Sequence, residues 1–326
     1  MARLTFLVLP ALVALTPVLA AAQSKGPDYP NRPIRMLIPF APGGATDIIA
    51  RMIEPRMSRA LGQQIVVDNR AGAAGNIAVE LTAQAHPDGY TLLVGNISTN
   101  SINPILFAGR TKVNAVKDLA GVTKLVAIPN FLLGSPKMPP TLKEAIEYAK
   151  ARPGQLNYGA PLGSYSHLDM LAFTAKAGIR MVHIPTKGAG ETLTNLLRND
   201  SNIQISNVAS NIGPVRAGQI RAYAVTGAKR LAEAPNVPTM AEAGFPGIGS
   251  DNWNGLFAPA RTPKAVIAKL HAVAVAAMKD LEAEGVLEKR QTPISLSASP
   301  ADFDAYVLSE LRRWEGIIRS NKVRID

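Results

Sequence analysis

Hydrophobic and polar positions alternate along the chain as short apolar runs followed by helical patterns. Residues 34–40 (IRMLIPF) join β-branched and other apolar residues, which predicts a buried strand. Apolar residues then recur at helical spacing over 48–61, although Pro55 inside this pattern should kink or split the helix. The next patterns predict strand 64–69, helix 76–86 and strand 90–95. Strands that alternate with helices in this way predict a parallel sheet with right-handed crossovers.

A second set of patterns follows the first. Strands are predicted at 125–133, 155–160, 181–186, 203–206, 220–227 and 254–260, and helices at 141–151, 167–178, 191–199, 264–289 and 300–320. Two sets of this kind predict an α/β protein with two lobes and a mainly parallel sheet in each.

The lobe boundaries follow from the strands that bracket the second set. We expect lobe 1 to consist of residues 30–124 and 228–326, and lobe 2 of residues 125–227. The two crossings between the lobes would then form a hinge that permits closure around a ligand.

The first 22 residues differ from the rest of the chain. They combine Arg3, an apolar stretch and small residues at 20–22, which is typical of a secretory signal peptide (residues 1–22) cleaved before Gln23. The alternative is a membrane anchor, but Pro10 and Pro17 interrupt the run, which is shorter than the roughly 20 residues that a spanning helix needs. The sequence has no cysteine, so a lipid on an N-terminal cysteine and any disulfide are excluded. We therefore expect a free, soluble protein exported to the periplasm.

The net charge of +11 raises the question of nucleic-acid binding. Lysine and arginine are mostly scattered singly, however, with adjacent pairs only at 229–230, 289–290 and 312–313, and aromatic residues make up 5% of the chain. No basic tract alternates with aromatic residues. The charge is better suited to attracting a small anionic molecule.

The segments that follow the predicted strands are rich in Gly, Ser, Thr and Asn. They are residues 41–47 (APGGATD), 69–76, 95–104, 159–167 (GAPLGSYSH), 185–190 and 206–211. In open α/β sheets ligands bind beyond the carboxyl ends of strands, and a helix N-terminus preceded by glycine holds anions through its free N–H groups. Each segment alone is equally consistent with an ordinary turn. Their occurrence in both lobes favours an anion site.

Motifs for other chemistry are missing from the sequence. It contains no P-loop and no strict G-x-G-x-x-G after a strand, and residues 163–167 (GSYSH) lack the G-x-S-x-G pattern of hydrolases. Neighbouring Ser and His on one turn seldom have triad geometry, and no H-E-x-x-H zinc motif occurs, so we expect neither a cofactor nor a metal. His86, His183 and His271 are interpreted as structural or solvated. The sequence predicts that the loop at 41–47 holds an anion without acting on it chemically.

Many segments also match one known family, in the same order along the chain. These are residues 29–51, 61–80, 86–95, 102–107, 156–168, 183–197, 220–247 and 253–263. Together they resemble Bug-type extracytoplasmic solute-binding proteins, the receptors of tripartite tricarboxylate transporters. The resemblance implies a two-lobed Venus flytrap of the type II periplasmic class, a small carboxylate ligand, transporter membrane subunits as partners and no enzymatic activity. We expect a monomer.

The resemblance also implies which residues contact the ligand. In lobe 1 they are Phe40, Pro42, Gly43, Gly44, Thr46, Asp47, Ser98 and Thr99; in lobe 2 they are Ala160, Gly163, Ser164, Ser166, His167, Lys187, Gly188 and Asn207. Within this set, the backbone around Gly43 and Thr46 would clasp one carboxylate, with Phe40 as an apolar wall.

Some positions depart from the family pattern. Thr186 stands where many members have Tyr, the segment 161–165 (PLGSY) replaces a turn richer in Ser and Gly, and Asn195 and Asn207 stand where Asp is common. Fewer acids disfavour an ammonium group in the cleft, which favours a carboxylate without an amino group. Two other functions stay open at this point: a binding protein that reports to a sensor kinase, and a secreted hydrolase or isomerase.

Overall fold

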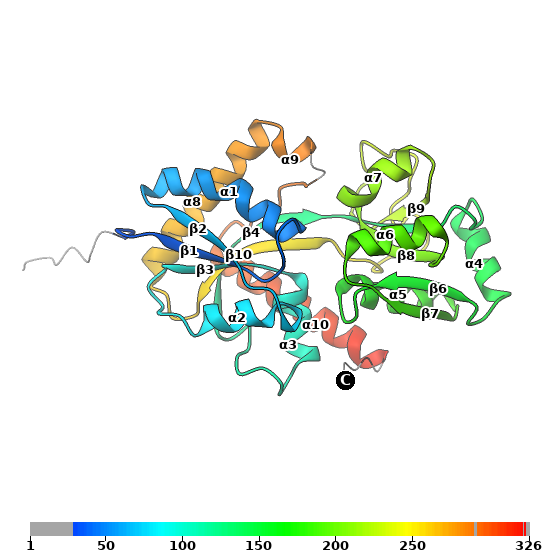
Figure 1. Ribbon diagram of the computed structural model, residues 1–326, viewed down its shortest axis with the longest axis horizontal. Coiled ribbons are helices and arrows are strands. Elements are labelled where there is room, and N and C mark those ends of the chain that lie inside the picture. Colours follow the sequence, from blue (N-terminus) through cyan, green and yellow to red (C-terminus); the bar gives the residue numbers. More distant parts are fainter. Residues whose placement is uncertain (1–28, 290–291, 322, 324–326) are drawn as a thin grey trace, which may run out of the picture.

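The computed structural model of the chain describes residues 29–289, 292–321 and 323, which form two lobes side by side (Figure 1). The predicted two-lobed α/β class is confirmed. The predicted signal peptide, residues 1–22, lies outside the described residues. Within the described residues, no helix is both long and apolar enough to cross a membrane.

The first lobe is built on a five-stranded sheet with the order β2-β1-β3-β10-β4. Its strands are β1 (Ile34–Ile38), β2 (Ile65–Asn69), β3 (Thr91–Asn96), β4 (Leu119–Ile128) and β10 (Asn252–Pro259). Along β1, Met36 and Ile38 belong to one apolar cluster and Leu37 to the cluster on the opposite face, because successive side chains of a strand point to opposite sides. The sheet is therefore buried on both faces, which explains why its strands are continuous apolar runs.

Two layers of helices cover this sheet (Figure 1). Helices α1 (Ala45–Leu61) and α8 (Lys264–Ala283) pack on the Met36 face, and α2 (Asn76–Ala83) and α10 (Pro300–Ser320) pack on the Leu37 face. Shorter pieces complete the lobe: a 3-10 turn (Ala73–Gly75), a π-helical turn (Ser98–Ile102), α3 (Asn103–Leu106) and α9 (Val286–Lys289).

One helix prediction is narrowed and another is corrected. The helix containing Pro55 is not split, because α1 continues through this residue to Leu61. The single helix predicted over 264–289 is instead α8 and α9, separated at Gly285, whose φ of +67° lies in the left-handed region that ends helices.

The second lobe contains a three-stranded sheet, β8-β5-β9, and a two-stranded sheet, β6-β7. The strands are β5 (Asn130–Gly134), β6 (Leu156–Ala160), β7 (Met181–Pro185), β8 (Ile203–Asn207) and β9 (Arg221–Val225). The helices are α4 (Leu142–Lys150), α5 (Tyr165–Ala177), α6 (Ala189–Arg198) and α7 (Val208–Arg216). The Asn202 N–H donates to the Asn157 carbonyl (2.8 Å), which joins the two sheets at their adjacent edges.

Strand pairing is mixed in both lobes, which corrects the expectation of mainly parallel sheets. β1 runs parallel to β2 and β3, and β6 parallel to β7, but β10 is antiparallel to β3 and β4, and β5 is antiparallel to β8 and β9. The reason is a double crossing: the chain passes between the lobes twice. The chain leaves lobe 1 along β4 and returns along β10, so these neighbours must run in opposite directions. The strand predicted over 125–133 is correspondingly two strands, β4 and β5, divided at Pro129 and belonging to different lobes.

The segment after β9 packs on lobe 2 before the chain returns. Met240 is buried in the same cluster as β5, β6 and α5 residues, and Phe245 packs against that cluster. We therefore propose that the second crossing lies near Ser250, whereas the sequence placed it at residue 228. The Ser250 hydroxyl donates to Asp169 on α5 (3.0 Å) and accepts from Arg313 on α10 (2.7 Å). This residue thus links one helix of each lobe.

Candidate ligand-binding cleft

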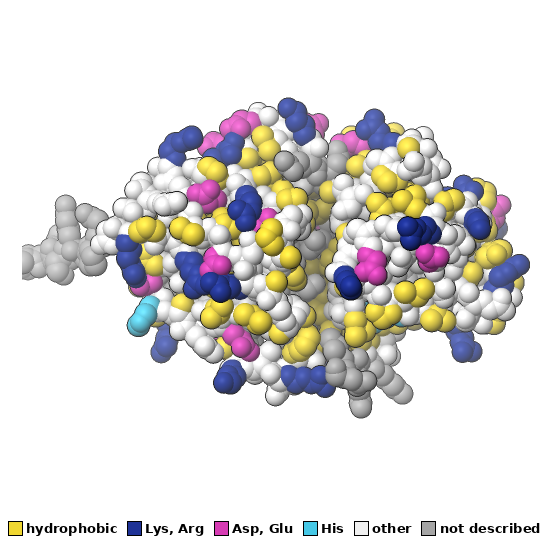
Figure 2. All heavy atoms as spheres, in the orientation of Figure 1, with side chains coloured by type: hydrophobic (Ala, Val, Ile, Leu, Met, Phe, Trp, Pro, Cys, Tyr) yellow, Lys and Arg dark blue, Asp and Glu magenta, His cyan; other side chains and the backbone are white. Residues whose placement is uncertain are grey.

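A cavity of about 590 Å³ lies between the lobes, where Figure 2 shows a groove. Both lobes contribute to its walls. The lining residues are Pro42, Gly43, Gly44, Ala45, Ile48, Ile49 and Ile128 from lobe 1, Ala189, Gly190, Asn207, Ala209 and Ser210 from lobe 2, and Thr292. Of the predicted ligand residues, Pro42, Gly43, Gly44 and Asn207 line this cavity.

The lobe 1 wall is the turn between β1 and α1. Gly43 has a φ of +86°, a conformation that is strained for any residue with a side chain. Its N–H donates to Asp47 Oδ2 (2.9 Å). Gly44 is the N-cap of α1 and has no side chain with which to cap it. The first-turn N–H groups of α1 are therefore left for another acceptor, with Ala45 on the cavity wall.

Asp47 supports this turn from within lobe 1. Asp47 is 3% exposed, and its carboxylate accepts hydrogen bonds from Gly43, Arg51 and Asn69. Burial alone would raise the pKa of this carboxyl, but the hydrogen bonds from Arg51, Gly43 and Asn69 together hold the pKa below its ordinary value. Asp47 is thus an ionised acceptor for the turn and does not line the cavity.

Several other predicted residues of lobe 1 are also turned inward. The Thr46 hydroxyl donates to Asn254 Oδ1 on β10 (2.7 Å). Thr99 is fully buried, and its hydroxyl accepts from the Asn96 N–H (3.0 Å). Phe40 and Ser98 are half-buried and do not line the cavity. In this structure these four residues therefore lie outside the cavity lining.

In lobe 2 the turn between β6 and α5 has a similar construction. Gly163 has a φ of +72°, and its N–H donates to Nδ1 of His167 (3.1 Å). Ser164 is the N-cap of α5, and its hydroxyl accepts from the His167 N–H, donates to the Pro161 carbonyl (2.7 Å) and lies 2.9 Å from that of Ser166. His167 Nδ1 therefore accepts from a backbone N–H and not from a serine hydroxyl.

His167 is 6% exposed and stacks on His183 of β7, with ring centroids 4.0 Å apart. Burial, together with the neighbouring His183, lowers the pKa of His167 to about 4, so its ring is neutral at pH 7. The predicted residues Ala160, Gly163, Ser164, Ser166 and His167 all belong to this turn, and none of them lines the cavity.

Two further helices of lobe 2 begin at the cavity. Gly188 is the N-cap of α6 and offers no capping side chain, and Ala189 and Gly190 of its first turn line the cavity. Lys187 is exposed, and its N–H donates to Glu191 Oε2 (2.8 Å). At α7, Asn207 caps the helix by accepting from the Ser210 N–H (2.8 Å).

The sequence patterns missed α7. Pro214 and Gly213 inside the helix obscured its periodicity, although Asn207 before a short apolar segment was a usable N-cap signal.

The cavity is therefore faced by the N-termini of α1, α6 and α7. Among the described residues that line it, none carries a charged side chain, and Ile48, Ile49 and Ile128 give it an apolar side. Helix N-termini carry partial positive charge and free N–H donors, which suit an anion better than a cation. The geometry fits a small anion with an apolar body.

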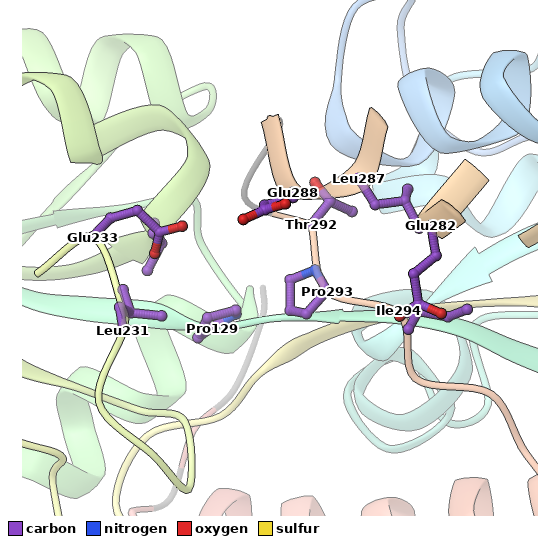
Figure 3. A pocket seen from close by; sticks show the side chains of 10 residues that line it. Pro129, Leu231, Glu233, Glu282, Leu287, Glu288, Thr292, Pro293 and Ile294 are labelled. Carbon is purple, nitrogen blue, oxygen red and sulfur yellow. The ribbon is translucent and has the colours of Figure 1, made fainter. Parts of the chain in front are cut away.

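A second cavity, of about 460 Å³, lies beside the crossings (Figure 3). Its walls include Glu233, Glu282 and Glu288 together with Pro129 and Leu231. Carboxylate side chains line this cavity, whereas the cavity between the helix N-termini has none among its described lining residues. The cavity between the helix N-termini is the better anion site.

Comparison with known proteins gives consistent matches. The family model described as "Tripartite tricarboxylate transporter family receptor" matches residues 49–323. The protein BugT of Bordetella pertussis is 32% identical over 308 residues, covering 94% of each chain. Among solved structures, an R. palustris protein with adipate is 32% identical with a TM-score of 0.81, covering 91% of this chain and 99% of its own.

The structure of MatC from Rhodopseudomonas palustris with bound malate is 31% identical with a TM-score of 0.78, covering 89% of this chain and 100% of its own. Structures similar to this chain are periplasmic binding proteins, which confirms the predicted Bug-type resemblance and the binding-protein class.

Proposed function

Because the chain belongs to the family of tripartite tricarboxylate transporter receptors, which bind solutes and are not enzymes, we propose that it captures a small carboxylate between its lobes. The observation that carries this proposal is the uncharged cavity faced by the N-termini of α1, α6 and α7. A carboxylate there would accept hydrogen bonds from backbone N–H groups, which need no desolvated lysine or arginine.

The two glycine-capped helices supply the donors. In this proposal one carboxylate lies at the N-terminus of α1, next to Gly44 and Ala45, and a second polar group lies at the N-terminus of α6, next to Ala189. The carbon chain between them would pack against Ile48 and Ile128. A ligand that spans both lobes stabilises their closure, because only the closed form satisfies both of its ends.

The preferred ligand is a carboxylate without an amino group. An ammonium group in a cavity needs an acidic partner, and among the described lining residues there is none. Asn207 stands where the family resemblance suggested an acid, and its side-chain oxygen accepts from the Ser210 N–H.

We further propose that the protein is exported to the periplasm after removal of residues 1–22, acts as a monomer and delivers its ligand to the membrane subunits of a tripartite transporter. The support is the family membership and the pattern of the first residues. N-terminal sequencing of the protein from cells should find a chain that begins near Gln23. Retention of Met1 would contradict export.

The ligand proposal is tested by thermal unfolding with a panel of acids that includes malate, adipate and their amino-substituted analogues. At a hundredfold excess over its dissociation constant, a ligand should stabilise the fold by about 2.7 kcal/mol. For lobes of this size the melting temperature should rise by about 5–10 °C. Stabilisation by cationic or amino compounds alone would overturn the proposal.

A further inference from the structure

Two imidazole rings hold the lobe 2 turn between β6 and α5. His183 of β7 donates from Nε2 to the Ala160 carbonyl at the end of β6 (2.9 Å), and His167 accepts the Gly163 N–H at Nδ1 (3.1 Å). The rings stack nearly parallel, with centroids 4.0 Å apart and an angle of 11° between planes. The beginning and the tip of the turn are thus fixed by one pair of side chains.

These hydrogen bonds define the state of each ring. Ala160 offers only a carbonyl oxygen, so His183 Nε2 must carry a hydrogen. Gly163 offers only an N–H, so His167 Nδ1 must be unprotonated and the ring neutral. A proton on His167 Nδ1 would remove the acceptor for Gly163 and place a cation against the neighbouring imidazole.

The surroundings add one further titratable group to this stack. Tyr158 of β6 lies 5.1 Å from the His183 ring and 6.1 Å from the His167 ring, and is itself buried. On α5, the Asp169 carboxylate accepts from Ser250 and lies 3.8 Å from Arg313, so its partners are at the crossing. Among the described residues, the groups stacked on His167 are therefore the aromatic rings of Tyr158 and His183.

The Ala160 carbonyl connects this pair to the ligand cavity. It also accepts the N–H of Thr186 (3.1 Å), which immediately precedes the turn into α6. The Thr186 hydroxyl lies 2.8 Å from that of Thr192, which in turn donates to the Gly188 carbonyl (2.9 Å). Gly188 is the N-cap of α6, and the next residue, Ala189, lines the cavity.

We propose that His183 is a positioning residue for the ligand: through Ala160 and through its stack on His167, it holds the start of α6 and the Gly163 turn in the geometry that binds the carboxylate. This inference rests on the proposed function of the cavity. The sequence pattern had suggested only a structural or solvated role for His183.

The test compares three substitutions in the purified protein. His183→Phe keeps an aromatic ring for the stack but removes the donor to Ala160, while His183→Gln keeps an N–H donor without the ring. The matched control is His271→Phe in lobe 1, because His271 also binds a backbone carbonyl, that of Val122, at 2.9 Å from Nδ1. The probe is adipate or malate, whichever stabilises the wild-type protein more.

We expect His183→Phe to weaken binding of that acid roughly tenfold, the effect of one lost hydrogen bond, and His183→Gln to restore part of it. His271→Phe should leave the affinity unchanged. Wild-type affinity in both His183 variants would overturn the proposal.

Hydrogen exchange of the Gly163 amide gives a readout that needs no ligand. Exchange should become faster in His183→Phe and stay at the wild-type rate in His271→Phe. If the wild-type protein bound none of the acids while His183→Phe still exchanged faster at Gly163, the proposed function would be contradicted, whereas the positioning of the turn by His183 would be supported. Unchanged Gly163 exchange in His183→Phe and His183→Gln would overturn the positioning role itself.

Discussion

The β1–α1 turn of lobe 1 and the β6–α5 turn of lobe 2 have the same local design. In each, a glycine with positive φ precedes the helix N-cap, and the third helical residue accepts the N–H of that glycine: Asp47 from Gly43 and His167 from Gly163. The α6 turn repeats the bond without a positive φ, as Glu191 accepts from Lys187. In each case the acceptor fixes the turn that precedes its own helix.

The two turns differ in their caps and in their acceptors. Gly44 leaves the first-turn N–H groups of α1 uncapped, whereas Ser164 caps α5 with its own hydroxyl. Asp47 accepts as a carboxylate, whereas His167 accepts only as a neutral ring. The comparison indicates that the N-termini of the glycine-capped helices, α1 and α6, are available to a ligand. The turn before α5 supports the site, and the stability of this turn depends on pH.

The largest expected effect comes from filling the missing cap. Gly44 has a φ of −75° and a β-carbon there would meet only the Ala41 carbonyl at 3.8 Å, so Gly44→Asp should fold. Its carboxylate would cap α1, raising stability by a few tenths of a kcal/mol, and would occupy the place of the ligand's carboxylate. We expect the ligand-dependent rise of about 5–10 °C in melting temperature to vanish.

The control for this experiment is Thr141→Asp, since Thr141 is the N-cap of α4 and lies outside the cavity. It should keep the full ligand-dependent shift. If Gly44→Asp kept that shift as well, α1 would not hold the ligand. Gly43 is less suitable for this test, because its φ of +86° makes any side chain strained.

Acidification should have a smaller effect, and the pH at which this effect appears should differ between the two turns. The His167 pKa of about 4 lies below the ordinary 6.5, so the native state favours the neutral ring. Its contribution to stability is fully present above pH 6.5 and is lost as the pH falls toward 4. The Asp47 pKa is also lowered, but from 3.8, so its contribution is lost only at still lower pH.

Protection factors from amide exchange at pH 6.5 and pH 4.5 should therefore fall on acidification for Gly163 and stay unchanged for Gly43. His167→Asn offers an acceptor that does not titrate, by analogy with the bond that Asp47 makes, and should remove the pH dependence. Equal loosening of both glycines would show that the acceptors do not control the turns.

A second group on α5 should partly oppose this pH dependence. Burial raises the pKa of Asp169 to about 7, despite the favourable charge of Arg313 and the hydrogen bond from Ser250. Because the folded pKa lies above the unfolded value of 3.8, its contribution is present below pH 4 and is lost as the pH rises through 7. Denaturant unfolding at pH 5 and pH 8 should show this loss in the wild-type protein, and Asp169→Asn should abolish it. If the free energy of unfolding of Asp169→Asn still fell between pH 5 and pH 8 as in the wild type, another group would cause the loss.

The smallest effect concerns the serine cap. Ser164→Ala should destabilise the protein by about 1 kcal/mol, because α5 loses its only side-chain cap. Gly44→Ala should change stability by less, since α1 has no side-chain cap to lose. Equal losses in denaturant unfolding would contradict the difference between the two turns.

Local patterns were enough to predict most elements and the general place of the site. The apolar runs of β1, β3 and β6 and the spacing in α1, α5 and α10 are local properties, so strand and helix could be assigned residue by residue. Glycine and asparagine after the strands correctly placed Gly43, Gly44 and Asn207 near a cavity between the lobes. The resemblance to a family supplied the binding-protein class.

Other features depend on contacts between distant segments. The direction of β10, the division of the 125–133 strand at Pro129 and the packing of Met240 on lobe 2 follow from the double crossing, which no local pattern records. The hydrogen-bond partners of Asp47, Thr46 and His183 could not be predicted either, because the three-dimensional fold decides which atoms each side chain meets.

The sequence by itself determined where helices begin without a capping side chain, because a glycine at an N-cap lacks the atoms to satisfy the N–H groups behind it. Only the tertiary structure decided that two such helices, α1 from one lobe and α6 from the other, open onto the same cavity. The physical reason is that an N-cap is set by neighbouring residues, whereas a binding cleft is set by the packing of segments far apart in the chain.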